Sequence, residues 1–320
     1  MEKVLVASIH DKLLCADWTK LTYSLKDGFI GIAIFLAQYS EFRRDKRARD
    51  LSTTILAQAL KGVDTFSGSL LYGRLGVYWT LRYLSNQGIL QESAEVKRRC
   101  FTGIVECMAL RSSTPIQIIY EDQLFSTGIY MLQCNSWENS FEHYVQKERL
   151  LILLDESEKI LTQTIKYIYA PTKMSLTTLH SVQFFLLELD KMRLCPFLTR
   201  QLLSYTPVLF EELRKDGSAD QYIFHYLLHN ETASIPKDFD EKELFQFMGA
   251  LGLYSMLYDI PNLFHSAWLQ AYRKYPDFFI NLPNKIRNGT FDIGVLCGLG
   301  YGLLNNLIGN NKRNKKIGKA

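Results

Sequence analysis

Proline and long hydrophobic runs are both scarce in this chain. Only eight prolines occur in 320 residues, and alternation of apolar and polar residues between turn signals is nearly absent. Because proline interrupts helices and alternation is typical of half-buried strands, both absences favour helices. No apolar run approaches the roughly 20 residues that a membrane-spanning helix needs. We therefore expect an all-α protein that is not inserted into a membrane.

Secretory and disulfide patterns are also missing. Glu2 and Lys3 precede an apolar stretch that is too short for a signal peptide. The six cysteines are scattered and form no CxxC pair, so reduced thiols are expected. These features predict a cytoplasmic protein.

An excess of one charge is lacking as well. The net charge is +4. Part of it comes from cations near the carboxyl terminus: Lys312, Arg313, Lys315, Lys316 and Lys319. The rest of the chain is nearly neutral, which argues against a nucleic-acid partner. We expect residues 311–320 to form a disordered basic tail.

A short glycine motif recurs along the chain. It consists of a small residue, two variable residues, a glycine and then bulky apolar residues. Clear copies lie at 28–36 (GFIGIAIFL), 73–81 (GRLGVYWTL), 249–257 (GALGLYSML) and 294–304 (GVLCGLGYGLL), with weaker ones at 125–132 and 181–187. Self-similarity of this kind is typical of repeat architectures.

Two kinds of helix alternate between these motifs. Segments apolar on nearly every face follow the motifs, at 30–37, 75–84, 128–132, 182–189, 251–257 and 299–307. Amphipathic, charge-rich segments separate them, at 43–60, 92–110, 148–169 and 197–215. A helix that is apolar on every face must be buried on every face, whereas an amphipathic helix exposes one face.

This alternation predicts an α/α toroid, a double α-barrel of about six to seven inner and outer helix pairs. An open solenoid is the alternative, but it would leave one face of the inner helices exposed. The glycines cluster where inner helices begin and converge, and a residue without a side chain allows backbones to approach closely. Because no linker or composition break interrupts the pattern, we expect one domain over residues 1–310.

The motifs resemble the lanthionine synthetase C-like family, the cyclases of lantibiotic biosynthesis. Residues 298–304 (GLGYGLL) are similar to the family's final repeat, GIGYALL, and residues 28–36 to its early repeats, GxxGIAxFL. The resemblance extends over roughly residues 25–307. It implies a double α-barrel whose inner helices each start at a GxxG-type motif.

The resemblance also implies a zinc site, and here the sequence departs from the family. Active cyclases hold zinc with a cysteine from one late repeat and a Cys-His pair from the next. The metal lowers the pKa of the peptide's cysteine thiol, which then adds to a dehydrated serine or threonine. This chain has Leu179, Phe247 and Met248 at these positions. Leucine and phenylalanine carry no donor atom and methionine binds zinc poorly, so we predict that the zinc cofactor is absent.

The mouth of the barrel is the expected ligand site. Residues around the starts of the inner helices form the predicted rim: Asp27, Tyr72, Asp122, His180 and Met248. His180 is also a weak candidate for a catalytic residue, with a structural histidine as the alternative. Glu121 stands beside Asp122, but adjacent side chains diverge on a helix, so an acid–base pair is poorly supported.

Two further sets of residues have ordinary structural interpretations. His225 and His229 show the i,i+4 spacing that zincins use, yet no glutamate follows His225, and we expect a structural pair. Cys134 and Cys297 have no histidine near them in the sequence and are expected to be buried, inert thiols.

These observations predict a lanthionine synthetase C-like pseudoenzyme. It would bind a peptide or a peptide-modifying partner enzyme in a lantibiotic-type pathway, through a largely neutral, aromatic-lined mouth. One alternative is an active peptide cyclase that forms thioether rings with a non-standard site. Another is a carbohydrate-active (α/α)6 barrel, although acids and tryptophans are scarce at the starts of the inner helices.

Overall fold

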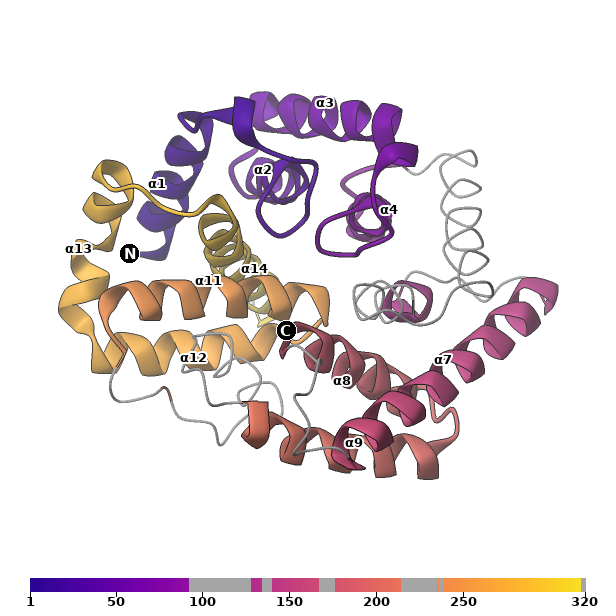
Figure 1. The fold of residues 1–320 in the computed structure, drawn as a ribbon. Helices are drawn as coiled ribbons and strands as arrows, with labels where there is room; N and C mark the ends of the chain where they lie inside the picture. The colour runs from indigo at the N-terminus through magenta and orange to yellow at the C-terminus, as the bar shows by residue number, and fades with distance from the viewer. Residues whose placement is uncertain (92–127, 134–139, 167–175, 214–234, 236–238, 318–320) are drawn as a thin grey trace. The chain divides into compact units, whose positions relative to one another are not determined.

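The regular structure of the chain is helical wherever the structure describes it. The computed structural model describes residues 1–91, 128–133, 140–166, 176–213, 235 and 239–317. Regular elements in these ranges are all helices (Figure 1). The all-α class expected from the sequence is confirmed. None of the helices in these ranges is long and apolar enough to cross a bilayer.

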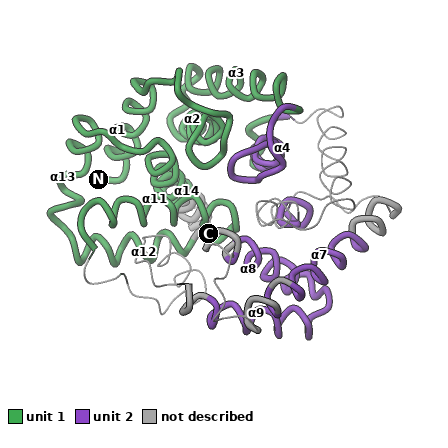
Figure 2. Tube along the Cα trace, in the orientation of Figure 1, with its two compact units in different colours: residues 1–64, 86–90, 218–320 green, residues 65–85, 91–217 purple. Residues whose placement is uncertain are grey.

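The chain divides into two compact units. Unit 1 comprises residues 1–64, 86–90 and 218–320, and unit 2 comprises residues 65–85 and 91–217 (Figure 2). The single domain expected over residues 1–310 remains a prediction.

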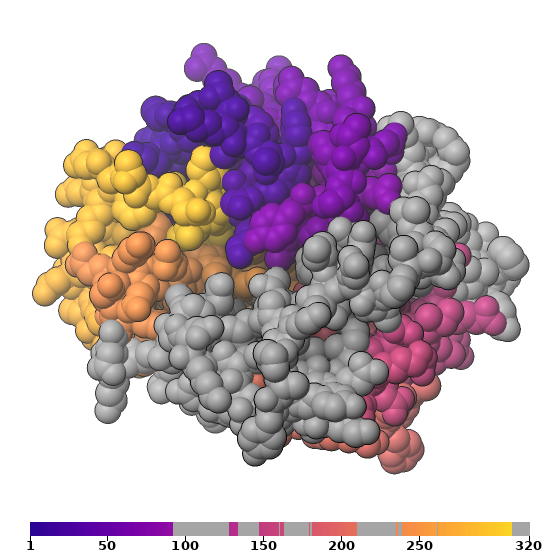
Figure 3. Space-filling view, viewed as in Figure 1, coloured from indigo at the N-terminus to yellow at the C-terminus, as the bar shows by residue number. Residues whose placement is uncertain are grey.

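Unit 1 contains helices from both ends of the chain. They are α1 (Glu2–Leu14), η1 (Trp18–Lys20), α2 (Phe29–Arg43), α3 (Lys46–Gly62), α11 (Glu241–Leu257), α12 (Pro261–Lys274), α13 (Pro276–Asn288) and α14 (Ile293–Ile317), with η2 (Val63–Thr65) at the boundary. In Figure 3 the indigo amino-terminal and yellow carboxyl-terminal residues form one continuous surface. Helix α14 packs against α2, α11, α1 and α12, so it is the centre of this unit.

The distinction between inner and outer helices is confirmed in unit 1. Helix α2 is buried without interruption from Ile30 to Ser40, as its uniformly apolar sequence predicts. Helix α3 covers it with one face only, and Ser52 Oγ donates a buried hydrogen bond of 2.7 Å to the carbonyl of Ala33. In the same way α12 packs against α11.

The first and last inner helices pack directly against each other. The Tyr301 hydroxyl of α14 donates a buried hydrogen bond of 2.6 Å to the carbonyl of Gly31 in α2. Outside this pair, α1 packs on α13 and α14, and Lys12 Nζ donates to the Arg287 carbonyl at 3.4 Å. The contact between α2 and α14 is the one that a closed ring of inner helices requires.

Unit 2 contains the middle of the chain. Its helices are α4 (Arg74–Asn86), a helical segment at 128–133, α7 (Ser140–Lys166), α8 (Leu176–Lys191) and α9 (Pro196–Leu213). Helix α9 packs on both α7 and α8. Trp79 Nε1 of α4 donates to Gln133 Oε1 at 2.9 Å, which joins α4 to the segment 128–133. The amphipathic helix predicted over residues 92–110 lies outside the described residues.

Helix α11 begins about two turns before its glycine motif. The expectation that each inner helix starts at its motif is met by α2 and α4 but is wrong for α11. A capping box explains the early start: the Glu243 amide donates to Asp240 Oδ1 at 2.7 Å, and the Asp240 amide donates to Glu243 Oε2 at 3.0 Å. Gly249 therefore lies in the middle of a continuous helix.

Helix α14 continues to Ile317, so most of the tail expected to be disordered is helical. No proline or glycine interrupts residues 310–317, and Gly318 follows directly. Cations in the last turns of a helix also interact favourably with its dipole.

Candidate functional site

The loops that precede α2 and α4 are two copies of one structure. The Phe29 amide donates to the Thr22 carbonyl at 2.9 Å, and the Arg74 amide donates to the Ser67 carbonyl at 2.8 Å. In both copies a Cβ on the first glycine of the motif would overlap that same carbonyl oxygen. Glycine is therefore required there by close backbone approach.

Two predicted rim residues occupy equivalent positions in these loops. The backbone amides of Asp27 and Tyr72 donate to the hydroxyls of Ser24 and Ser69, both at 3.3 Å. The Ser24 hydroxyl also donates to Asp27 Oδ1. Asp27 is exposed, and Tyr72 keeps 46% of its surface accessible. Both residues are thus exposed, one in unit 1 and the other in unit 2.

The positions that the resemblance assigns to zinc ligands lie in apolar cores. Leu179 and Phe247 are fully buried, and Met248 is 1% exposed. The ring of Phe247 packs against Phe239 with centroids 5.5 Å apart. Two of these side chains have no donor atom and the third is a thioether, so the residues present do not fit Zn²⁺.

The predicted rim falls on both units, and it remains a prediction. Asp27 and Met248 belong to unit 1, and Tyr72 and His180 belong to unit 2. Met248 lies in the core of α11, and His180 lies in α8 next to Leu179. Several predicted residues or side chains lie outside what the structure describes: the His180 side chain, Asp122, Glu121, Cys134, His225 and His229. Among the described residues, no group of three or more His, Cys, Asp or Glu could hold a metal ion.

Next to Met248, α11 and α14 cross with their glycine backbones in contact. A Cβ on Gly298 would overlap the carbonyl oxygen of Gly249, and a Cβ on Gly252 would overlap that of Gly298. The obstacle in each case is backbone rather than a side chain that could rotate away. In these two helices the motif therefore serves close helix packing.

Cys297 lies one residue before this crossing and is buried. Burial raises the pKa of its thiol far above the usual range, although a hydrogen bond with Tyr301 acts in the opposite direction. The thiol therefore stays protonated at neutral pH, and a buried, protonated thiol is a poor nucleophile. This agrees with the inert role expected from the sequence.

We expect iodoacetamide at pH 8 to modify Cys15 and Cys195 well before Cys297. The first two are exposed, whereas the raised pKa of Cys297 leaves almost no thiolate at that pH. Peptide mapping by mass spectrometry after timed quenching would measure the three rates. The same reaction in urea is the control, and there the three rates should converge. Equal rates in the native protein would contradict the burial of Cys297.

The family model described as Lanthionine synthetase C-like protein matches residues 19–176. This match, over just under half of the chain, supports membership in the lanthionine synthetase C-like family. The matched part of the chain contains the two equivalent loops and ends before Leu179. Members of the family fold as helical toroids, which supports the fold class expected from the sequence. No match was found among curated proteins or solved structures.

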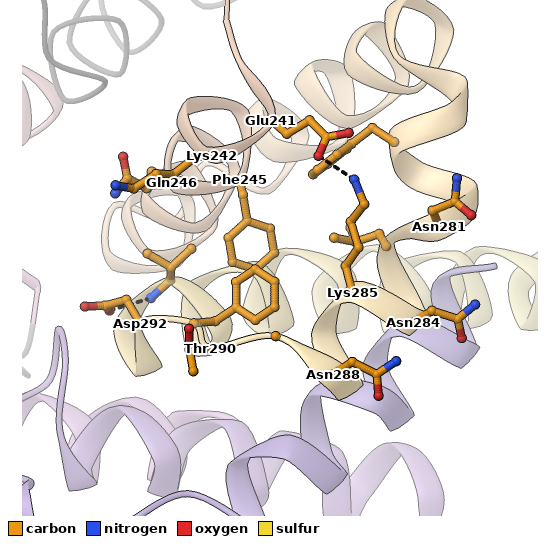
Figure 4. Close-up of a pocket in the computed structure, with 15 residues that line it drawn as sticks. Glu241, Lys242, Phe245, Gln246, Asn281, Asn284, Lys285, Asn288, Thr290 and Asp292 are labelled. Atoms are coloured by element: carbon orange, nitrogen blue, oxygen red, sulfur yellow. Dashed lines mark hydrogen bonds and ion pairs between the residues drawn. The ribbon is translucent and has the colours of Figure 1, made fainter.

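The chain also has a groove that the sequence did not predict. It lies within unit 1, between the first turns of α11, one side of α13, and residues 289–295 (Figure 4). Its volume is about 850 Å³, within the range of ligand-binding pockets. None of the five rim residues lines it. We call it the amide groove, after the side chains on its walls: Gln246 on α11, and Asn281, Asn284 and Asn288 on α13.

The floor of the amide groove is aromatic and aliphatic. Phe245 and Phe291 pack with ring centroids 4.6 Å apart, and Phe245 lies between the two walls in Figure 4. Phe278 and Leu282 of α13, with Val295 of α14, complete the apolar lining. The apolar and amide residues of α13 recur at helical spacing, which is the one sequence signal that could have indicated this surface.

The charges around the amide groove compensate one another. Glu241 forms an ion pair with Lys285, whose ammonium also lies 5.3 Å from the centre of the Phe278 ring. Asp292 Oδ1 accepts a hydrogen bond of 3.1 Å from the Val295 amide at the start of α14. Lys242 supplies the remaining cation. Two cations and two anions therefore line a groove of no net charge.

Proposed function

We propose that this family member is a pseudoenzyme that works without zinc and binds a peptide or a peptide-modifying partner enzyme. The observation that carries this proposal is the burial of Leu179, Phe247 and Met248 in apolar cores. Where the family places metal ligands, this chain has hydrophobic side chains that contribute to packing.

Loss of the metal removes the means by which the family activates a thiol. A free cysteine has a pKa near 8.5, so only a few per cent is thiolate at neutral pH. Without a Lewis acid beside it, the thiol of a substrate peptide would add slowly to a dehydrated residue. What the chain retains is the family's helical scaffold, which supports a binding role in a modified-peptide pathway of the lantibiotic type.

We expect the purified, untagged protein to contain far less than one zinc ion per chain. A family site with intact ligands would hold its metal in a one-to-one ratio. Elemental analysis of the native protein measures the ratio directly. As a control, adding zinc should not raise the melting temperature, because only a ligand that binds the folded state stabilises it. Near-stoichiometric zinc that survives dialysis would overturn the proposal.

A further inference from the structure

We propose that the amide groove binds a short, uncharged peptide segment in an extended conformation. The inference rests on the proposed peptide-binding function and adds to it a location and a class of ligand. It is carried by three features of the groove: unpaired side-chain amides on both walls, an apolar floor, and compensated charge.

The amides offer what a peptide backbone needs. A side-chain amide has a carbonyl acceptor and two N–H donors, so it can pair with both the N–H and the C=O of an extended chain. The side-chain amides of Gln246, Asn284 and Asn288 form no hydrogen bond with the described residues. Asn281 Nδ2 donates to the Asp277 carbonyl at 3.0 Å, which leaves its own carbonyl oxygen available.

The spacing of the amides fits an extended chain. Asn281, Asn284 and Asn288 follow one another at three and four residues, so they share one face of α13. They span roughly 10 Å along the helix at 1.5 Å per residue. That length corresponds to about three residues of extended peptide at about 3.3 Å each. Gln246 lies across the groove from them, where it could pair with the other edge of the bound segment (Figure 4).

The floor favours aliphatic side chains over sugars. Phe245 and Phe278 are 5% and 7% exposed, so little of either ring is open to the groove, and Phe291 is only partly exposed. A sugar stacks on an exposed aromatic face, whereas an apolar side chain can contact ring edges. Alternate side chains of an extended peptide point to the same side, and these would lie on this floor.

The charges favour a neutral ligand. Lys285 is already paired with Glu241, and Lys242 is balanced by Asp292 on the groove wall. A groove of this kind exerts no strong field on a phosphate or on a highly acidic peptide. Electrostatic complementarity therefore selects a segment without net charge.

A selection from a random library tests the proposal. Displayed decapeptides with blocked ends are selected on the purified full chain, and the enriched sequences are synthesised with a fluorescent label for anisotropy measurements. We expect uncharged sequences with apolar residues at alternate positions. The double variant Asn284→Ala/Asn288→Ala should bind them about tenfold more weakly, because two hydrogen bonds are lost.

Two further variants make the test specific. Gln246→Ala removes an amide from the opposite wall and should weaken binding in the same direction, which separates lost contacts from a local defect in α13. Asn86→Ala, at an exposed position that ends α4, is the matched control and should bind as the parent protein does. All variants should keep the melting temperature of the parent protein, because the altered amides are exposed.

The outcomes separate this inference from the function on which it rests. If the enriched peptides bind the double variant as tightly as the parent protein, the groove is not the binding site, but the proposed peptide-binding function still holds. A selection that enriches no peptide would contradict both. Enrichment of mainly acidic peptides would contradict the charge argument, and self-association lost in the double variant would identify a second copy of the chain as the occupant instead.

Discussion

Replacement of Gly298 by alanine is expected to lower the free energy of unfolding by about 3 kcal/mol or more. The new methyl group would overlap the carbonyl oxygen of Gly249, which belongs to the backbone of α11. Relief requires α11 and α14 to move apart, and α1, α2 and α12 also pack on α14. Urea unfolding followed by far-UV circular dichroism would measure the loss. Gly252→Ala should act in the same way.

The direction of this effect is diagnostic because helix propensity predicts the opposite sign. Glycine to alanine in an open helix position gains about 1 kcal/mol. The matched control is Ala250→Gly in α11, where only the propensity cost of about 1 kcal/mol is expected. If Gly298→Ala unfolded at a higher urea concentration than the parent protein, the close crossing of α11 and α14 would be wrong.

The second large effect is expected at Phe247, the position that the resemblance assigns to a zinc-binding cysteine. Phe247→Ala should cost about 4 kcal/mol of unfolding free energy, since the ring is fully buried against Phe239. Phe197→Ala is the matched control, because that ring is 91% exposed. Its effect should stay within about 0.5 kcal/mol. Both values come from urea unfolding, with the transition of each unit fitted where the two separate.

The variant Phe247→Cys tests zinc binding as well as stability. It restores the family's residue, yet we expect it to destabilise the protein nearly as much as alanine does and to recruit no zinc. The cysteine would be a single donor beside Met248, whereas a structural or catalytic zinc site needs at least three protein ligands. A small cost for both substitutions would show that Phe247 is not part of the core.

Much of the fold could be predicted from the sequence because a fully buried helix and a half-buried helix differ in their local pattern of apolar residues. The uniformly apolar α2 and the one-sided α3 differ in pattern, and the structure places them inside and outside as predicted. The motif at Gly249 predicts a helix start there, whereas α11 begins at Glu241. Asp240 and Glu243, three residues apart, are the capping signal that indicates the correct start.

The site was harder to predict because the position of a residue within a repeated motif does not determine whether its side chain is exposed or buried. Asp27, Tyr72 and Met248 each precede the first glycine of a motif. The first two lie in loops and are accessible, whereas Met248 lies within a helix and is buried. The amide groove could not be predicted, since it depends on how the first turns of α11, one side of α13 and residues 289–295 come together in space, which the sequence pattern does not indicate.

The loop structure that precedes both α2 and α4 has a consequence for how such a protein can change over evolutionary time. Its backbone contacts agree within 0.1 Å between the two copies, although one carries a carboxylate at Asp27 and the other a phenol at Tyr72. These shared contacts are made by backbone amides, so they form with either side chain at this position, although in the first copy Asp27 Oδ1 also accepts a hydrogen bond from the Ser24 hydroxyl. Mutation there can alter the chemistry of the surface while the scaffold is inherited unchanged, so selection for a new ligand need not pass through unstable intermediates.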